Sequence, residues 1–355
     1  MAGEKIGTVP IFLGKWGLSL FSHMPLTLFV PDLLPPADAP AAMRELRLPR
    51  LEAWLARADA AREPGSGNAW LLRQWGLGAD APVAALTLAA DGGPREGLWM
   101  RADPVHQRLD RHSLVLHDAS VLALATEETA AALAALNDFF ARDGLAFIAP
   151  AGERWYVRLV PGEAPRTVPL DEAVGRNPFG MIPSAGARLS WPSIFSEAQM
   201  LLAGLPFNAA REAEGRPALN GVWFWGAGTF PAGLPTAFAA VVADDPLSRG
   251  LALASGSAVH ALPEGPADLP SGKSGDCLVV VATLRAALRR GDVGEWLATA
   301  RELERAWFTR IGDLLAEHGR VRIVLPAAQD TAVFDIVPKT RWRLFRSARA
   351  LASHA

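Results

Sequence analysis

Apolar residues occur along the chain in two patterns, short continuous runs and longer stretches with a helical period. Runs of about four to eight apolar residues between Gly, Pro or polar residues are typical of buried strands. The runs that predict strands are 26–30, 82–89, 114–116, 145–148, 155–159, 221–225, 237–242, 251–254, 277–282, 321–325 and 332–337. Several of them are separated by periodic stretches, and this order predicts an α/β fold.

The periodic stretches predict helices at 49–62, 69–76 and 126–141 and a longer helix that ends at His318-Gly319. In the segment 126–141, Thr126 is the expected N-cap, and the expected buried stripe is Leu133, Leu136, Phe139 and Phe140. The long helix starts at Asp292, with Glu295 three residues later as in a capping box. It carries Trp296, Leu303, Trp307, Ile311 and Leu314 on one face.

The order of these elements also suggests how the chain is divided. Residues 99–189 form a strand–helix–strand–strand unit, which we expect to be a smaller α/β lobe inserted into a larger domain. The larger domain is expected at 25–98 and 190–355, after an N-terminal extension at 1–24. The predicted fold class is therefore α/β, with a core sheet flanked by helices and an inserted lobe.

Composition limits the class of function. Half of the 355 residues are hydrophobic, a fifth are charged and the net charge is −2, so the chain has no basic field for nucleic acid or anionic lipid. No apolar stretch reaches the roughly 20 residues that span a bilayer. We expect a cytoplasmic protein that binds neither nucleic acid nor membrane. Its single cysteine, Cys277, is expected to be a buried, inert thiol in a reducing compartment.

The densest group of polar residues beside apolar ones lies at 196–228, SEAQMLLAGLPFNAAREAEGRPALNGVWFWGAG. Candidate ligand-binding residues in this stretch are Asn208, Arg211, Glu212, Asn220 and Trp225. Asn220 lies where a strand meets a loop, the position at which α/β proteins bind ligands. The alternative, which residue chemistry favours, is that the tryptophans are core residues and that Arg211 and Glu212 form a solvated helix end.

A second polar group lies at 98–118, LWMRADPVHQRLDRHSLVLHD. Asp103 and His106 are candidates for an acid/base or binding site, and Asp103-Pro104 is expected to be a turn. Arginines are as frequent here as carboxylates, so an anion-binding loop or an ion-pair network is favoured over a metal site. Arg176, in the turn Gly175–Pro178, is a further candidate for anion binding.

Asp32 and the basic C-terminal segment each have two interpretations. Asp32 follows the first strand, where hydrolytic α/β folds often place a metal-binding carboxylate, but the neighbouring prolines favour an ordinary turn. The C-terminal segment carries Lys339, Arg341, Arg343, Arg346 and Arg349 around Trp342 and Phe345. We expect it to form a helix packed on the core, with contact to phosphate or a membrane surface as the weaker alternative.

The two quoted stretches resemble a bacterial family of uncharacterised proteins, labelled phosphoglycerate mutases or regulatory proteins of a pathogenicity-factor cluster. The resemblance covers most of residues 26–345. More distantly, the chain resembles cofactor-independent phosphoglycerate mutases of the archaeal type, in the alkaline phosphatase superfamily. The resemblance implies an alkaline-phosphatase-like core sheet. Gly291-Asp292 followed by a long helix, and Leu325-Pro326 at the end of the next strand, match the order of elements in those enzymes.

The metal ligands of those enzymes do not match. Their positions fall near Arg285 and Arg289 and on Ala327 and Ala328. Two-metal phosphoryl transfer requires carboxylate and imidazole ligands, which alanine and arginine cannot replace. We therefore expect no metal cofactor. Arg285 and Arg289 are instead candidates for holding a phosphate or carboxylate, because a guanidinium pairs with two such oxygens at once.

Three classes of function follow. The leading hypothesis is a catalytically degenerate relative that acts as a regulatory protein or binds a phosphorylated or carboxylate small molecule, or a protein partner. The alternative is an active phosphoglycerate mutase-like phosphotransferase or phosphohydrolase that depends on a divalent metal, with ligands rearranged to Asp32, Asp103, His106 and His112. The third is an interaction protein that uses a Trp-rich surface, since the chain has 12 tryptophans.

Overall fold

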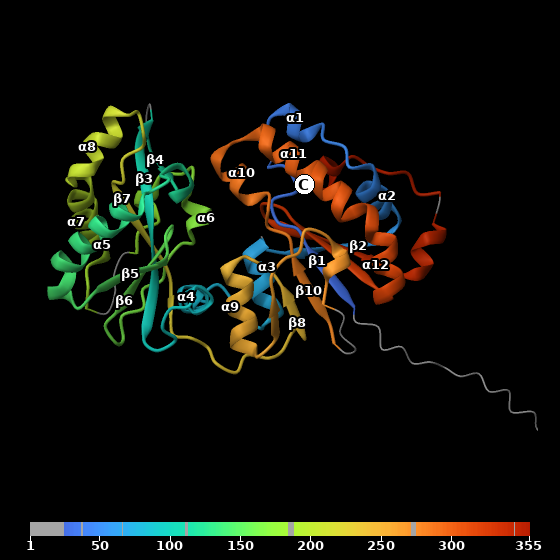
Figure 1. The fold of residues 1–355 in the computed structure, drawn as a ribbon, viewed down its shortest axis with the longest axis horizontal. Helices are drawn as coiled ribbons and strands as arrows, with labels where there is room; N and C mark the ends of the chain where they lie inside the picture. The colour runs from blue at the N-terminus through green and yellow to red at the C-terminus, as the bar shows by residue number, and fades with distance from the viewer. Residues whose placement is uncertain are drawn as a thin grey trace, which may run out of the picture.

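Two β-sheets organise the chain, one in each of two lobes (Figure 1). The computed structural model describes residues 25–36, 38–65, 67–110, 113–183, 188–270, 275–343 and 345–355. The expected extension at 1–24 and the candidate His112 lie outside these ranges.

The first sheet has seven strands in the order β2-β12-β11-β1-β10-β8-β9. Their bounds are β1 Leu26–Phe29, β2 Asp59–Pro64, β8 Ala240–Val242, β9 Ala258–His260, β10 Cys277–Val280, β11 Val321–Pro326 and β12 Asp330–Ile336. The five strands from β11 to β9 are parallel, and β12 and β2 complete one edge in antiparallel pairing. The carboxyl ends of the parallel strands therefore meet at one edge of the sheet, where open α/β sheets bind their ligands.

The second sheet has five strands, with β4, β3, β6 and β5 in order and β7 paired to β3. Their bounds are β3 Leu98–Asp110, β4 Ser113–His117, β5 Ala146–Ala151, β6 Arg154–Leu159 and β7 Gly221–Gly228. Because β7 pairs with β3 from Val105 to Trp99, the second sheet extends past residue 189, where we expected the inserted lobe to end.

Helices cover both faces of the first sheet and pack on the second. Their bounds are α1 Ala41–Arg44, α2 Pro49–Arg57, α3 Gly67–Gln74, α4 Val83–Ala90, α5 Thr126–Phe140, α6 Leu170–Ala173, α7 Trp191–Ala203, α8 Pro206–Ala213, α9 Pro246–Ser255, α10 Arg285–Arg290, α11 Val293–Ala306 and α12 Ile311–His318. Helices α4 and α9 lie between the two sheets (Figure 1).

The apolar run of β10 is continuous because both faces of this strand are buried. Leu278 and Val280 belong to one core cluster, which also contains Trp70 of α3 and extends into the second lobe. Val279 belongs to the cluster on the opposite face, with Trp296 of α11. Successive residues of a strand point to opposite faces, so a strand between two helical layers has no polar face.

Two runs that we predicted as strands, 82–89 and 251–254, are wrong. They lie in helices α4 and α9. Helix α4 is buried on nearly all sides, so its residues show no helical period, and a short apolar run cannot be assigned from its pattern alone. The two helices approach closely at Gly250, where an added Cβ would lie 2.2 Å from the carbonyl oxygen of Leu86.

The predicted turn at Asp103-Pro104 is also wrong, because both residues lie inside the 13-residue strand β3. Strand β6 pairs with β3 only as far as Arg101, and β4 pairs with it only from His106 onward. Between these points β3 has β7 on one side alone. Proline has no backbone N–H. On the open side of β3 no neighbouring strand would accept a hydrogen bond from position 104, so Pro104 costs no hydrogen bond of the sheet.

The predicted helix at 293–318 is interrupted and the C-terminal helix is not formed. A 3₁₀ turn at Phe308–Arg310 separates α11 from α12, although the Asp292 cap and the Gly319 end are confirmed. The C-terminal segment forms two short 3₁₀ turns, at Pro338–Trp342 and Leu351–His354. Two of its arginines, Arg343 and Arg346, bond to the backbone at the end of α2, as described below.

The tryptophans of the described residues form core and not surface. Seven of them are among the largest fully buried side chains. Of the tryptophans in the described part of the chain, Trp342 alone is largely exposed. This arrangement contradicts a Trp-rich interaction surface. No described helix is long and apolar enough to cross a membrane.

The thiol of Cys277 is buried at the start of β10, and burial raises its pKa to about 12. The thiolate is the reactive form. We therefore expect native protein to resist iodoacetamide at pH 8, and alkylation to occur at the rate of unfolding in intermediate urea. Rapid stoichiometric alkylation of native protein, measured by mass spectrometry, would contradict this burial.

Candidate functional site

Asp32 lies at the carboxyl end of the central strand β1 and has an unusual backbone conformation. Its φ is +64°, in the left-handed region that non-glycine residues rarely adopt. The indole Nε1 of Trp296 donates to its carbonyl oxygen at 2.9 Å. Such strained residues are concentrated at functional sites, where neighbouring contacts hold them in place.

The carboxylate of Asp32 is bound by an arginine. Arg285, the first residue of α10, donates from Nε to Asp32 Oδ2 at 3.0 Å. Both side chains are about one-quarter exposed. Burial alone would lower the pKa of Arg285, but Asp32, Asp171 and Asp245 raise it above its usual range, so the guanidinium stays charged.

The next turn of α10 joins the two lobes. Arg289 bonds to Asp171 Oδ1 of α6, and its Nη1 lies 3.3 Å from Asp118 Oδ2. The other oxygen of Asp171 accepts a hydrogen bond from Asn68 of α3 at 2.9 Å. In Figure 1, α6 lies on the side of its lobe that faces α10 and α3. Both oxygens of a carboxylate from the second lobe are thus held by residues of the first.

Asp171 remains ionised in this position. Desolvation opposes its charge, but Arg289 and Arg285 outweigh that effect and lower the pKa of the carboxyl below its ordinary value. The two guanidinium groups face four carboxylates, those of Asp32, Asp118, Asp171 and Asp245. The site therefore contains more carboxylates than guanidinium groups, although the sequence analysis had identified only its arginines as anion-binding candidates.

The carboxylates near the strand end are paired with arginines. Within the described residues, no group of three or more His, Cys, Asp or Glu side chains is placed to hold a metal ion. Asp32 is paired with Arg285, and Asp103 and His106 have other partners in the second lobe. Asp32 is thus not grouped with Asp103 and His106, and His112, the fourth residue of the alternative ligand set, lies outside the described residues.

Asp103 belongs to a buried network around Arg101. Arg101 Nε donates to Asp103 Oδ1 at 3.1 Å, and Trp225 Nε1 donates to Asp103 Oδ2 at 2.6 Å. The guanidinium of Arg101 lies over the rings of Tyr156 and Trp225, 5.1 and 5.4 Å from their centroids. Arg101 also contributes to the electrostatic stabilisation of Asp171. This network fixes β3 against β6 and β7 behind the site.

Most candidates of the central stretch stabilise the fold. Asn208 is buried and bonds to the backbone of Leu202 and Leu219. Arg211 is 1% exposed and not a solvated helix end, because it bonds to Glu128 at 2.6 Å and to two backbone carbonyls. Asn220 exchanges two hydrogen bonds with the backbone of Gln107 and joins β7 to β3.

The other candidates lie apart from this site. His106 Nδ1 contacts the carbonyl oxygen of Ala218 at 2.8 Å. Glu212 and Arg176 are exposed. The structure therefore brings Arg285 and Arg289 to the carboxyl edge of the parallel sheet, and leaves the remaining candidates in the second lobe.

Sequence analysis missed the acidic partners Asp118, Asp171 and Asp245 and the amide of Asn68. Asp245 is the N-cap of α9 and lies three residues after β8, so a carboxylate shortly after a predicted strand was a usable signal. Asp118 and Asp171 come from the second lobe, and their approach depends on how the lobes pack.

The fold and the site define a two-lobed α/β protein with a charged cluster between its lobes at the carboxyl edge of the sheet. No model of a protein family matches the sequence, and no curated protein matches it. The fold is similar to that of the PH0037 protein from Pyrococcus horikoshii, with a TM-score of 0.54 and 14% identity over 94% of this chain and 92% of the other.

A second solved structure is similar over nearly the whole chain, the cofactor-independent phosphoglycerate mutase from Thermoplasma acidophilum DSM 1728. The identity is 15%, the coverage is 94% of this chain and 95% of the other, and the TM-score is 0.44. Because this TM-score is below 0.5, we assign the shared fold from the similarity to the PH0037 protein.

His117 makes the stability of the second lobe depend on pH. Burial lowers its pKa, and His106 and Arg108 lower it further, against a smaller opposing effect of Asp118. In the unfolded chain this histidine has its ordinary pKa of about 6.5, so it binds a proton there at a higher pH than in the folded protein. The free energy of unfolding therefore falls as the pH falls through this value. We expect His117→Gln to reduce the slope of unfolding free energy between about pH 7 and pH 5. An unchanged slope in urea titrations would contradict this role.

Proposed function

We propose that this chain is a non-catalytic binding or regulatory protein that shares its fold with phosphoryl-transfer enzymes of the alkaline phosphatase superfamily. The observation that supports the proposal is the 3.0 Å ion pair between Arg285 and Asp32. A carboxylate at the end of the central strand would be a metal ligand in such an enzyme. Here the guanidinium supplies the positive charge that a bound cation would supply, and it brings no open coordination position for a substrate.

The ligand in this proposal is a phosphorylated or carboxylate small molecule. Asp171 supports this choice, because Arg289 and Asn68 hold its two oxygens as they would hold a free carboxylate. Its side chain is 41% exposed and lies on the four-residue helix α6. A carboxylate ligand would replace Asp171 one for one and leave the local charge unchanged. Ligand binding would then release a contact between the lobes, a coupling typical of regulatory proteins.

Wild-type protein tests the absence of metal chemistry, and Arg285→Ala tests the ion pair with Asp32. We expect wild-type protein to show neither stoichiometric Mn²⁺ binding nor phosphoglycerate mutase activity with added Mn²⁺, Mg²⁺ or Zn²⁺. Arg285→Ala should lose about 1–3 kcal/mol of stability in metal-free buffer, because it leaves a carboxylate unpaired. Urea unfolding measures this loss.

Arg290→Ala is the matched control, since Arg290 lies on the same helix and pairs with Glu295 at the surface. It should leave the free energy of unfolding nearly unchanged, because its ion pair is exposed to solvent. Turnover by the wild-type protein with bound metal would overturn the proposal.

Replacement of Asp171 tests the anionic ligand. Asp171→Asn removes the competing charge, so inorganic phosphate should bind about fivefold more tightly than to wild type, a modest factor because the carboxylate is half exposed. Glu172→Gln, at the next position of α6 and also exposed, should leave the affinity unchanged. Isothermal titration measures both. Equal affinity of Asp171→Asn and wild type would refute competition by Asp171, and absence of binding in all three would refute the ligand class at this site.

A further inference from the structure

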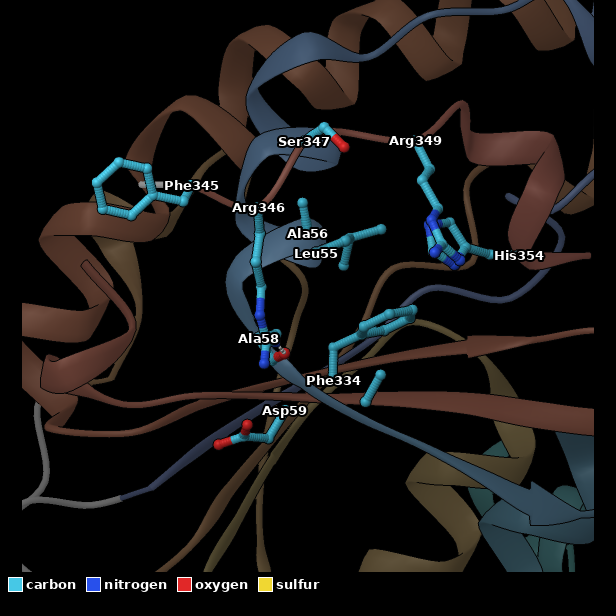
Figure 2. Close-up of a pocket in the computed structure, with 11 residues that line it drawn as sticks. Leu55, Ala56, Ala58, Asp59, Phe334, Phe345, Arg346, Ser347, Arg349 and His354 are labelled. Atoms are coloured by element: carbon cyan, nitrogen blue, oxygen red, sulfur yellow. Dashed lines mark hydrogen bonds between the residues drawn. The ribbon is translucent and has the colours of Figure 1, made fainter. Parts of the chain in front are cut away.

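A hollow of about 630 Å³ lies away from the site between the lobes, at the β2–β12 edge of the first sheet (Figure 2). We call it the C-terminal hollow. Its walls are the C-terminal segment from Phe345 to His354, the end of α2, and the start of β2. Its volume is within the range of about 300–1,000 Å³ that is usual for small-molecule sites.

The walls of the C-terminal hollow are held in place by hydrogen bonds. Arg343 binds the carboxylate of Asp59 at 2.5 and 3.1 Å and the carbonyl oxygen of Arg57 at 3.0 Å. Arg346 Nη1 donates to the carbonyl oxygen of Ala58 at 3.0 Å. At the far end of the segment, Arg62 donates to the carbonyl oxygen of His354 at 2.7 Å. The hollow is therefore formed before any ligand arrives, which lowers the entropic cost of binding.

Three basic side chains in the wall, those of Arg346, Arg349 and His354, form no ion pair with an acidic side chain of the described residues. Neither the Arg349 guanidinium nor the His354 imidazole has an ion pair or side-chain hydrogen bond with the described residues. Figure 2 shows Arg349 reaching toward His354. Burial lowers the pKa of that imidazole, and Arg62 and Arg349 lower it further against a smaller opposing effect of Glu52. Asp59 is the one carboxylate among the lining residues, and Arg343 already neutralises it. Arg346 and Arg349 therefore give the wall an excess of positive charge.

The floor of the hollow is apolar. Phe334 and Leu55 are each 2% exposed, and the His354 ring meets Phe334 edge to face, with centroids 5.2 Å apart. An apolar floor beside a few convergent polar groups is the usual composition of a small-molecule site.

We propose that the C-terminal hollow binds a small organic phosphate or carboxylate that carries an apolar ring. The anionic group pairs with Arg349 and the imidazole of His354, since a guanidinium forms charge-assisted hydrogen bonds with such oxygens. The ring lies against Leu55 and Phe334. This site is separate from Arg285 and Arg289, and it is an addition to the proposed function.

Phenyl phosphate is a suitable probe, because it combines one phosphate with one apolar ring. We expect it to bind wild-type protein and to shift the His354 imidazole resonance, assigned by its loss in His354→Gln. Arg349→Gln should weaken binding about tenfold or more, as measured by isothermal titration. Arg349→Lys, which keeps the charge but not the fork geometry, should weaken it less.

Lys339→Gln is the control, because Lys339 belongs to the same basic segment but does not line the hollow. It should leave the affinity unchanged. Arg289→Gln should leave the shift of the His354 resonance unchanged, which separates this site from the one between the lobes. Inorganic phosphate and phenol should each bind more weakly than phenyl phosphate. Equal binding by wild type and Arg349→Gln, or no shift of the His354 resonance, would overturn the proposal.

Discussion

The ion pair between Arg285 and Asp32 is the contact on which the arrangement of the central site depends. It joins the end of the central strand to the start of α10 and holds a residue with positive φ in place. The parallel strands direct several acidic side chains to one edge, and like charges collected in this way repel each other. A guanidinium among them supplies the compensating charge from within the chain.

The same helix extends this compensation to the second lobe. Arg289 follows Arg285 by four residues, so both side chains lie on one face of α10. One contacts the strand end and the other contacts Asp118 and Asp171 of the second lobe. Behind this face, α4 and α9 join the two sheets through a continuous apolar core. Charged contacts thus set the lobes at the carboxyl edge, and apolar packing fixes them below it.

The sequence pattern predicted elements reliably where a short apolar run is buried and Gly or Pro marks its ends. The strands β1, β7, β10 and β11 were predicted close to their observed bounds, since an apolar run between Gly or Pro leaves few alternatives. It failed for α4, whose uniform burial removes the helical period. It failed also for Arg211, because an arginine buried by bonds to Glu128 and distant carbonyls has the same local sequence as a solvated one.

The sequence by itself determined the α/β class and the buried strands of the first sheet, and it singled out Arg285 and Arg289 as candidates for binding an anion. These features follow from residue type and spacing over a few neighbouring positions. Only the tertiary structure decided the partners of those arginines, the long strand β3 and the hollow beneath the C-terminal segment. Asp171 and Arg289 are 118 residues apart, as Arg343 and Asp59 are 284 apart. Contacts at such separations depend on how whole elements pack, and local spacing does not encode them.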